Sequence, residues 1–181
     1  MATKSRIYSQ DNLSRPGVAF ALHIEDPLKR IQACLDSYKA SDDTEVFEYS
    51  LMANDLQLIS ATGLPHVGAV FELDVRKKYT NTMFNMQGGA VSLAFDMATT
   101  IATAPCATRD FWRFPGVSRT LSETFLRPIK LEMRVVIDCE VVQIGQRLAI
   151  TRATMRENAT GNMLAICEHN KASVVFKEPK L

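Results

Sequence analysis

One segment of this sequence constrains the fold more than any other, the run from Asn81 to Ala104. A short polar stretch ending in two glycines, Gly88 and Gly89, leads into residues that are apolar on nearly every face, and no proline follows before Pro105. Such a segment is typical of a helix buried in a protein core. It is too short and too rich in Ser and Thr to span a bilayer, which takes about 20 predominantly apolar residues. The sequence therefore predicts a central buried helix.

The one ionisable residue inside this helix is Asp96, which stands between Phe95 and Met97. Burying a carboxylate is costly, so it must be paired, hydrogen-bonded, placed at a wet edge or kept for chemistry. A purely structural explanation also exists, because several hydroxyl residues share its helix face and could hydrogen-bond along a wet stripe. The residues of this stripe are Ser92, Asp96, Thr99 or Thr100, and Thr103.

Composition excludes several classes of protein. The chain has 181 residues and a formal net charge of +1, so it suits a single folded unit with no bulk attraction to nucleic acid or to a membrane. No charged patch or membrane-length segment points to either partner.

The cysteines and the N-terminus indicate an intracellular, cytoplasmic protein. The four cysteines lie far apart with no C-x-x-C pair, which favours free thiols over a zinc or redox site, and we expect no metal and no cofactor. The first residues lack the apolar core of a signal peptide.

The N-terminal part predicts a tail and one amphipathic helix. Residues 1 to about 18 are polar and without periodicity. Asp26 can cap a helix that has Pro27 at its first position, and apolar residues then recur at three- and four-residue spacing up to Tyr38. We therefore expect residues 1–44 to add a tail and a helix to a main domain of residues 45–181. A partner-binding helix is the alternative.

The remaining chain predicts a mostly antiparallel sheet. An extended region begins at about Val46, an alternating strand covers 67–75, and four further strands follow a loop at 107–115. Turns at 62–65, at Gly145 and at 158–161 give these strands hairpin spacing. The fold class is therefore α+β, with two strands, the central helix and four strands, the sheet wrapping the helix.

This order of elements, together with several motifs, resembles the hotdog-fold acyl-CoA thioesterases. The family is the 4-hydroxybenzoyl-CoA thioesterase superfamily, in particular its phenylacetic-acid-degradation type, and the likeness covers about residues 50 to 175. The motifs that carry it are Asn81-Thr-Met-Phe-Asn-Met-Gln-Gly-Gly89, Asp96, Gly116-Val117-Ser118, Leu126-Arg127-Pro128, Gly145 and Thr160-Gly161.

The resemblance implies hydrolysis of an acyl thioester carried by coenzyme A or by acyl carrier protein. The backbone N–H of Gly88, at the positive end of the helix dipole, would polarise the carbonyl. Asp96 would act as general base or as nucleophile. Eight residues of helix separate the two by about 12 Å. The family resolves this in a dimer or dimer of dimers, in which Gly88 and Asn81 of one chain face Asp96 and Ser118 of the other.

The resemblance also names further residues. Gln87 stands where many relatives have a histidine, and an amide cannot titrate near neutral pH. Gly89 would let the substrate approach closely. From their position after the strand that carries Ser118, Arg127 and Lys130 are expected to contact the phosphates of coenzyme A at the dimer surface, the alternative being ordinary solvated cations beside a loop. The alternative for Asn81 is an ordinary turn residue.

Other functions have weaker support in the sequence. A hotdog hydratase would have a histidine five residues after Asp96, where this chain has Ile101, and a non-catalytic thioester-binding dimer is a further alternative. The chain has no G-x-S-x-G, H-E-x-x-H or P-loop motif. His169 is expected to be a surface or sheet residue, and residues 111–114 are expected to form a lid or wall.

Overall fold

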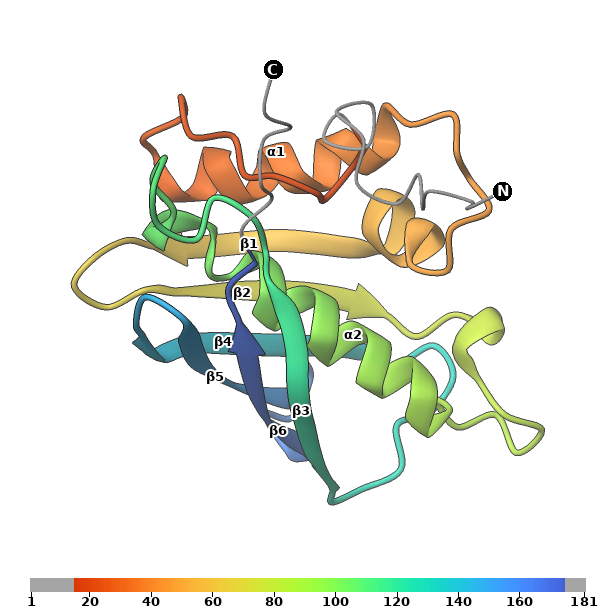
Figure 1. Cartoon of the computed structure of the whole chain (residues 1–181). Coiled ribbons are helices and arrows are strands. Elements are labelled where there is room, and N and C mark those ends of the chain that lie inside the picture. The colour runs from red at the N-terminus through yellow and green to blue at the C-terminus, as the bar shows by residue number, and fades with distance from the viewer. Residues whose placement is uncertain (1–14, 175–181) are drawn as a thin grey trace, which may run out of the picture.

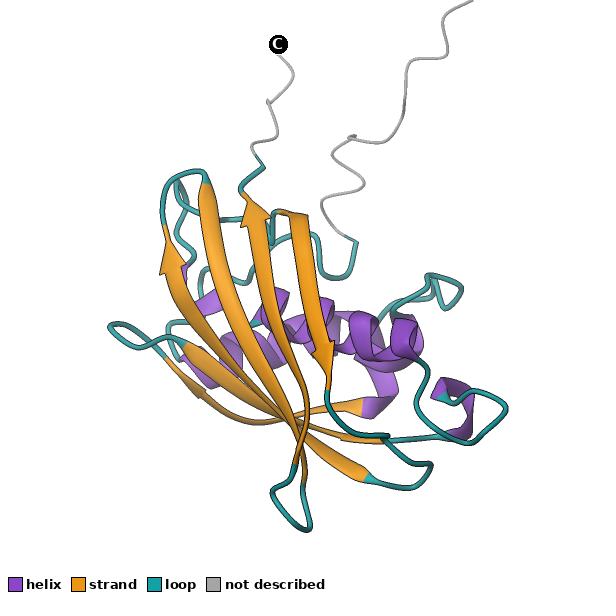
Figure 2. Cartoon of the chain, turned by 90° about the horizontal axis from the view of Figure 1, so that it is seen from below, coloured by secondary structure: helices purple, strands orange, loops and turns teal. Residues whose placement is uncertain are grey.

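Six strands form one antiparallel sheet that curls around helix α2 (Gly88–Ile101). The structure is a computed structural model that describes residues 15–174. The strands lie in the order β1-β2-β4-β5-β6-β3, so that β1 and β3 are the two edges. Figures 1 and 2 show α2 inside the curve of the sheet. The strands are β1 (Leu56–Thr62), β2 (Gly68–Asp74), β3 (Val117–Phe125), β4 (Arg134–Ile144), β5 (Leu148–Glu157) and β6 (Met163–Ala172).

The predicted α+β class, the central helix and the order of two strands, helix and four strands are confirmed. All five strand pairs are antiparallel. This is the arrangement expected of a hotdog fold. The predicted tail at residues 1–18 lies mostly outside the described residues.

The predicted extended region from Val46 is wrong over its first ten residues. Residues 46–50 form turns and the start of a helical turn, Leu51–Asp55 is a short π-helix, and the strand begins only at Leu56. The physical reason is that Leu51, Met52 and Ala53 are all buried. A helical turn can bury three consecutive side chains, whereas a strand sends alternate side chains to opposite faces.

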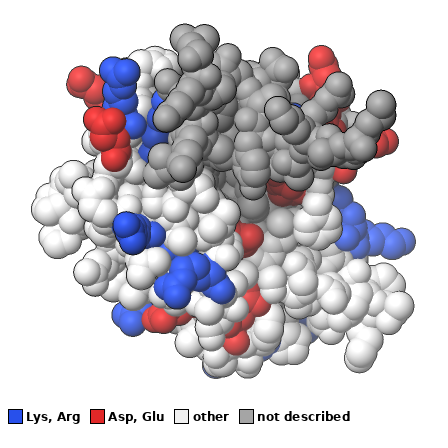
Figure 3. Space-filling model, viewed as in Figure 1, with Lys and Arg blue, Asp and Glu red and all other residues white. Residues whose placement is uncertain are grey.

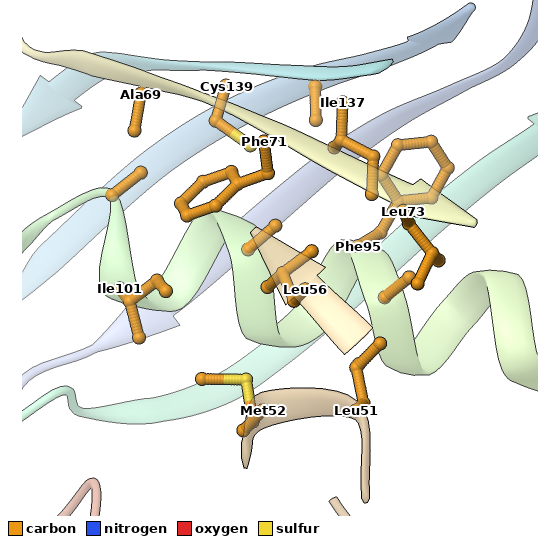
Figure 4. Packing of buried hydrophobic residues seen from close by; sticks show 14 of the residues in the cluster. Leu51, Met52, Leu56, Ala69, Phe71, Leu73, Phe95, Ile101, Ile137 and Cys139 are labelled. Carbon is orange, nitrogen blue, oxygen red and sulfur yellow. The ribbon is translucent and has the colours of Figure 1, made fainter. Parts of the chain in front are cut away.

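The core lies between α2 and the inner face of the sheet. Phe95 and Ile101 of α2 are buried against Phe71 of β2 and Ile137 of β4. Figure 4 shows these side chains gathered around α2 with residues from the 51–56 segment. Strand β2 alternates between buried and partly exposed residues, as the sequence predicted for a strand with one covered face.

Helix α1 (Pro27–Lys39) packs against the outer part of this core. Asp26 caps it as predicted, since its side chain accepts a hydrogen bond of 2.8 Å from the Lys29 N–H. Its buried residues, among them Ile31 and Leu35, belong to the same cluster as those of α2. The apolar face of α1 is therefore covered within this chain. The division at residue 44 stays a prediction.

A buried arginine joins α1 to the end of the α2 segment. The Arg30 guanidinium donates hydrogen bonds to four backbone carbonyls, and among the described residues no carboxylate forms an ion pair with it. The carbonyls belong to Leu22, Ile24, Ala104 and Ala107. Two of these follow α2, where the helix dipole is negative and favours a cation.

We predict that Arg30→Met lowers the free energy of unfolding by about 2–4 kcal/mol, because it leaves buried carbonyls without donors. Urea unfolding followed by circular dichroism measures the change. Lys29→Met, which removes an exposed cation from the same helix, is the matched control and should stay within about 0.5 kcal/mol of the unmodified protein. Equal effects of the two substitutions would contradict this role of Arg30.

Candidate active site

A row of polar side chains lies between α2 and the strands β3 and β6. Ser118, near the start of β3, donates a hydrogen bond of 3.1 Å to Asp96 Oδ1. His169 of β6 lies with its Nε2 2.9 Å from Ser118 Oγ and its Nδ1 2.7 Å from Thr99 Oγ1. Two residues that the sequence predicted for the site, Asp96 and Ser118, are therefore in direct contact.

A β-bulge brings Ser118 to the inner face of the sheet. The register between β3 and β6 shifts between Ser118 and Thr120. The extra residue, Arg119, lets Ser118 face α2 together with the partly buried Leu121, although three positions separate them. Without the bulge, two residues an odd number apart would point to opposite faces.

The Asp96 carboxylate lies at a wet edge and is not enclosed. Its side chain is 38% exposed, and Oδ1 also accepts a hydrogen bond of 3.4 Å from Thr100 Oγ1. No described residue hydrogen-bonds to Oδ2. The carboxylate is thus held through one oxygen, and the other is available to a ligand. Part of the predicted wet stripe is present here, because Thr100 contacts Asp96 along the helix.

The prediction of His169 as a surface or sheet residue did not include its contacts with the site. The residue is in a strand as expected, but its side chain is 0% exposed and its Nε2 lies 3.7 Å from Asp96 Oδ1. Burial, helped by the nearby Lys171 cation and opposed by Asp96, lowers the pKa of His169 to about 4. The ring is therefore neutral at neutral pH.

The contacts of His169 allow one continuous row of donors. Because Ser118 donates its one proton to Asp96, Nε2–H donates to Ser118. Nδ1 of the neutral ring then accepts the Thr99 proton, which the Phe95 carbonyl, 2.6 Å from the same Oγ1, would otherwise accept. Every proton in this row points toward the carboxylate. A neutral histidine behind Ser118 orients the hydroxyl and does not itself reach the exposed edge.

Lys171 supplies a second row that also ends on Asp96. Its side chain is 2% exposed, and its Nζ donates a hydrogen bond of 2.8 Å to Thr100 Oγ1. The Thr100 hydroxyl can in turn donate to Asp96. Burial lowers the pKa of Lys171 to about 8, while the Asp96 charge opposes the decrease, so the ammonium group is still charged at neutral pH.

One signal in the sequence could have located both residues. Positions 165, 167, 169 and 171 alternate on one face of β6, and the first two are Ala165 and Cys167, which belong to the apolar core. The same alternation places His169 and Lys171 on the covered face, where polar groups need partners.

The N-terminus of α2 holds the other predicted group. Gln87 caps the helix, and its side-chain oxygen accepts a hydrogen bond from the Gly89 N–H. The N–H of Gly88 has no acceptor among the described residues, as expected for the first helical position. A Cβ at Gly88 would meet only Phe125 Cζ, at 3.7 Å. Gln87 therefore has a capping role, and the Gly89 N–H is already bound.

Asn81 is part of a tight turn before α2. Its Oδ1 accepts hydrogen bonds from the N–H groups of Met83, at 2.9 Å, and Asn85, at 3.2 Å. The turn alternative is therefore observed, and a contact of Asn81 with substrate stays a prediction.

A buried carboxylate anchors the loop that carries Asn81. Asp55 accepts a hydrogen bond of 2.7 Å from Tyr79 Oη and forms ion pairs with Arg76, at 2.9 Å, and Lys78, at 2.5 Å. The Tyr79 carbonyl in turn accepts from the Gln87 N–H, at 2.8 Å. This connection fixes the entry of the chain into α2.

The remaining predicted residues lie near the end of β3. Arg127 donates a hydrogen bond of 2.6 Å to the Met163 carbonyl, and Lys130 forms a bridge with Asn85 in the loop before α2. Both side chains are exposed. Their contact with coenzyme A stays a prediction.

The loop at 111–114 packs against the protein. Trp112 is buried, and its Nε1 donates a hydrogen bond of 2.7 Å to the Gly145 carbonyl; Phe114 is buried as well. Trp112 is therefore packed into the protein and is not placed as a lid, and a wall of the substrate pocket formed by this loop stays a prediction.

Residues 15–174 contain neither a cluster of metal ligands nor a membrane-spanning helix. No group of three or more His, Cys, Asp or Glu side chains there is placed to hold a metal ion. No helix in that range has the length and apolarity needed to cross a membrane.

Within one chain the two halves of the predicted site stay apart. Helix α2 and strand β3 run antiparallel beside one another, so that Gly88 lies near Phe125 and Asp96 lies near Ser118. Gly88 and Asp96 are about 12 Å apart along the helix. Within residues 15–174, strand β3 pairs only with β6, and no strand of that range lies along its other edge.

Several known proteins resemble this chain in sequence or in fold. The sequence model of the thioesterase superfamily matches residues 85–164. Acyl-coenzyme A thioesterase 13 of Homo sapiens is 31% identical over 102 residues, which cover 56% of this chain and 70% of that protein. The crystal structure of zebra fish thioesterase superfamily member 2 superposes with a TM-score of 0.67 at 22% identity, over 81% of this chain and 98% of that one.

A bacterial structure has the same fold. The Escherichia coli PaaI protein, from the phenylacetic acid degradation operon, superposes with a TM-score of 0.58 at 14% identity, over 81% of this chain and 92% of that one. The hotdog fold expected from the motifs is confirmed by these structural matches.

The burial of neutral His169 predicts a specific pH dependence of stability. Because its native pKa of about 4 lies below the ordinary value of 6.5, the unfolded chain takes up the proton first as the pH falls. The stability contribution is complete above pH 6.5 and is lost toward pH 4. Between pH 7 and about pH 4.5, the unmodified protein should lose roughly 1–3 kcal/mol more than His169→Gln.

Urea unfolding at the two pH values measures this difference. His66→Gln is the matched control, because His66 is exposed. The control should follow the unmodified protein. If His169→Gln does so too, His169 is not buried in its neutral form.

Proposed function

The chain belongs to the thioesterase superfamily and hydrolyses acyl thioesters, and we propose that its substrates are acyl-coenzyme A thioesters bound between two copies of the chain. The acyl carrier is proposed from the human relative, whose name describes acyl-coenzyme A as its substrate. The two copies are proposed from the geometry of α2 and β3.

The arrangement of α2 beside β3 supports a shared site most strongly. Ser118 lies three residues before Leu121, the central residue of β3, and Phe125 lies four residues after it; Ser118 is beside Asp96 and Phe125 is beside Gly88. If two β3 edges pair antiparallel about Leu121, Ser118 of one copy lies opposite Thr124 of the other, next to Phe125. An isologous pairing of this kind brings each Asp96 toward the Gly88 N–H of the second copy and makes two equivalent sites.

Each half then has a defined chemical task. The Gly88 N–H and the helix dipole polarise the thioester carbonyl and stabilise the oxyanion. Asp96 is the carboxylate that activates water or attacks the carbonyl itself. The carbon–sulfur bond then breaks, and the thiolate is a good leaving group because thiols ionise near pH 8.5.

The buried rows around Asp96 would position it for this task. Ser118 and Thr100 hold Oδ1, with His169 and Lys171 behind them, and leave Oδ2 toward the solvent edge. A carboxylate fixed in one orientation avoids reorganisation at the moment of reaction.

The helix entrance would bind the substrate. The Gln87 amide oxygen is used in capping, so its NH₂ group remains to donate to the carbonyl, together with Asn81. Arg127 and Lys130 are proposed as ligands of the coenzyme A phosphates. Figure 3 shows acidic and basic side chains interspersed on the face it displays, so a few local cations, and no broad basic field, would serve this contact.

We also propose a cytoplasmic location. All four cysteines are free and buried, an arrangement suited to a reducing compartment.

Asp96→Asn should lower kcat for acyl-CoA hydrolysis by roughly 10²–10⁴-fold, because the amide can neither take up the proton nor attack. Release of free coenzyme A, detected with a thiol reagent, measures the rate. Asp110→Asn makes the same change in an exposed loop and is the control. Unaltered turnover in Asp96→Asn would remove Asp96 from the mechanism.

The shared site predicts complementation between two inactive variants. Gly88→Pro removes the N–H at the first helical position, where proline is tolerated, and the extended Gln87 suits a residue before proline. Co-expression of Gly88→Pro with Asp96→Asn should restore about a quarter of the full activity, since half of the dimers are mixed and each has one intact site.

Two tags allow the mixed dimers to be purified and counted. Gly88→Ala is the control for shape, because it keeps the N–H and its added Cβ meets only the Phe125 ring edge. Mixed dimers that form but stay inactive would show that each site comes from a single chain.

A further inference from the structure

A second carboxylate lies on the same side of α2, between the two halves of the proposed site. Ser92 Oγ is 2.6 Å from Glu123 Oε2 and 3.1 Å from the Gly88 carbonyl. Glu123 is on β3, two residues before Phe125, and it faces α2 as Ser118 does. The row from the helix entrance to the catalytic carboxylate is therefore Gly88, Ser92 and Asp96.

The hydrogen bonds of this pair are incomplete. Ser92 has a single hydroxyl proton, and the Gly88 carbonyl already accepts the Ser92 N–H within the helix, so the hydroxyl donates to the closer Glu123 Oε2. Glu123 Oε1 is buried and has no hydrogen-bond partner among the described residues. A buried carboxylate oxygen without a donor is costly and needs one from outside the chain.

The position of Glu123 limits what that donor can be. Ser92 is four residues from Gly88 and four from Asp96, or about 6 Å along the helix from each. In the proposed site, Gly88 of one copy holds the thioester carbonyl and Asp96 of the other copy attacks it. The first carbons of the acyl group then lie beside Ser92 and Glu123. The neighbour across the sheet, Cys167, belongs to the apolar core and offers only a weak donor.

We propose that Glu123 selects acyl groups that carry a hydrogen-bond donor close to the thioester, as in a 3-hydroxyacyl group, and disfavours acyl groups that end in a carboxylate. This inference rests on the proposed function, because it uses the same shared site. A hydroxyl on the acyl chain supplies the proton that Oε1 lacks. An unsubstituted alkyl chain leaves Oε1 unpaired, and a second carboxylate faces a like charge.

The experiment compares three coenzyme A thioesters of four-carbon acids: butyryl, 3-hydroxybutyryl and succinyl. The quantity measured is kcat/KM for each, in the unmodified protein and in two variants. Glu123→Leu removes the acceptor at similar volume, and Glu123→Gln removes the charge at the same shape. Glu140→Gln, on the sheet face turned away from α2, is the matched control.

The kcat/KM for 3-hydroxybutyryl-CoA divided by that for butyryl-CoA should fall by roughly 10- to 100-fold in Glu123→Leu. This is the loss expected when a hydrogen bond to a charged group is removed. The ratio of succinyl to butyryl should rise about 10-fold or more in Glu123→Gln, since the repulsion is gone. The control should keep both ratios.

Three results would overturn the inference. If the unmodified protein hydrolyses these thioesters and both ratios are the same in the Glu123 variants, Glu123 does not contact the acyl group. The same conclusion follows if the variants lose only dimer stability in sedimentation, because Oε1 then binds the second copy. If no acyl-CoA of any chain length is hydrolysed, the proposed function fails and the inference fails with it.

Discussion

The structure depends on the way α2 is buried by two different surfaces. Its apolar residues, such as Phe95 and Ile101, pack against β2 and β4 and supply the main part of the core. Its polar residues Ser92, Asp96 and Thr99 face β3 and β6, where each has a hydrogen-bond partner. Burying this polar face costs little free energy only because strands β3 and β6 carry side chains that hydrogen-bond to it. The pairing of the polar face fixes the rotation of α2 and, with it, the direction of Asp96.

This constraint explains why the two groups proposed for the reaction lie apart, one at the start of α2 and one near its middle. The free N–H groups of a helix occur only in its first turn, which is where the proposed oxyanion-binding amide, Gly88, is found. A carboxylate that needs polar partners must lie further along the helix, where Ser118 of β3 and His169 of β6 are close to it. The two requirements cannot be met at one point of a straight helix. Among the described residues, strand β3 has no partner along its second edge, and this is the edge at which we propose that the second copy binds.

Much of the fold could be predicted from the sequence because it rests on local patterns. The apolar run, the glycine pair, the Asp26–Pro27 start of α1 and the alternating strands each have a period or a cap that identifies them. The prediction for Leu51–Asp55 was wrong because consecutive apolar residues fit neither the helical nor the strand period better than the other. Asp96 and Ser118 were accessible through motifs. No motif identifies His169 and Lys171; the alternation along β6 indicates only that their side chains are covered, because the partners that define their role lie about 70 residues earlier in the chain.

The most direct test is a crystal structure of the protein with a non-hydrolysable acyl-CoA analogue that keeps the carbonyl. The account predicts that the carbonyl oxygen accepts a hydrogen bond of about 3 Å from the Gly88 N–H of one subunit. It also predicts that the carboxylate nearest the carbonyl carbon is Asp96 of the other subunit. A carbonyl bound by Gly88 and approached by Asp96 of the same chain, or one bound away from both, would contradict it.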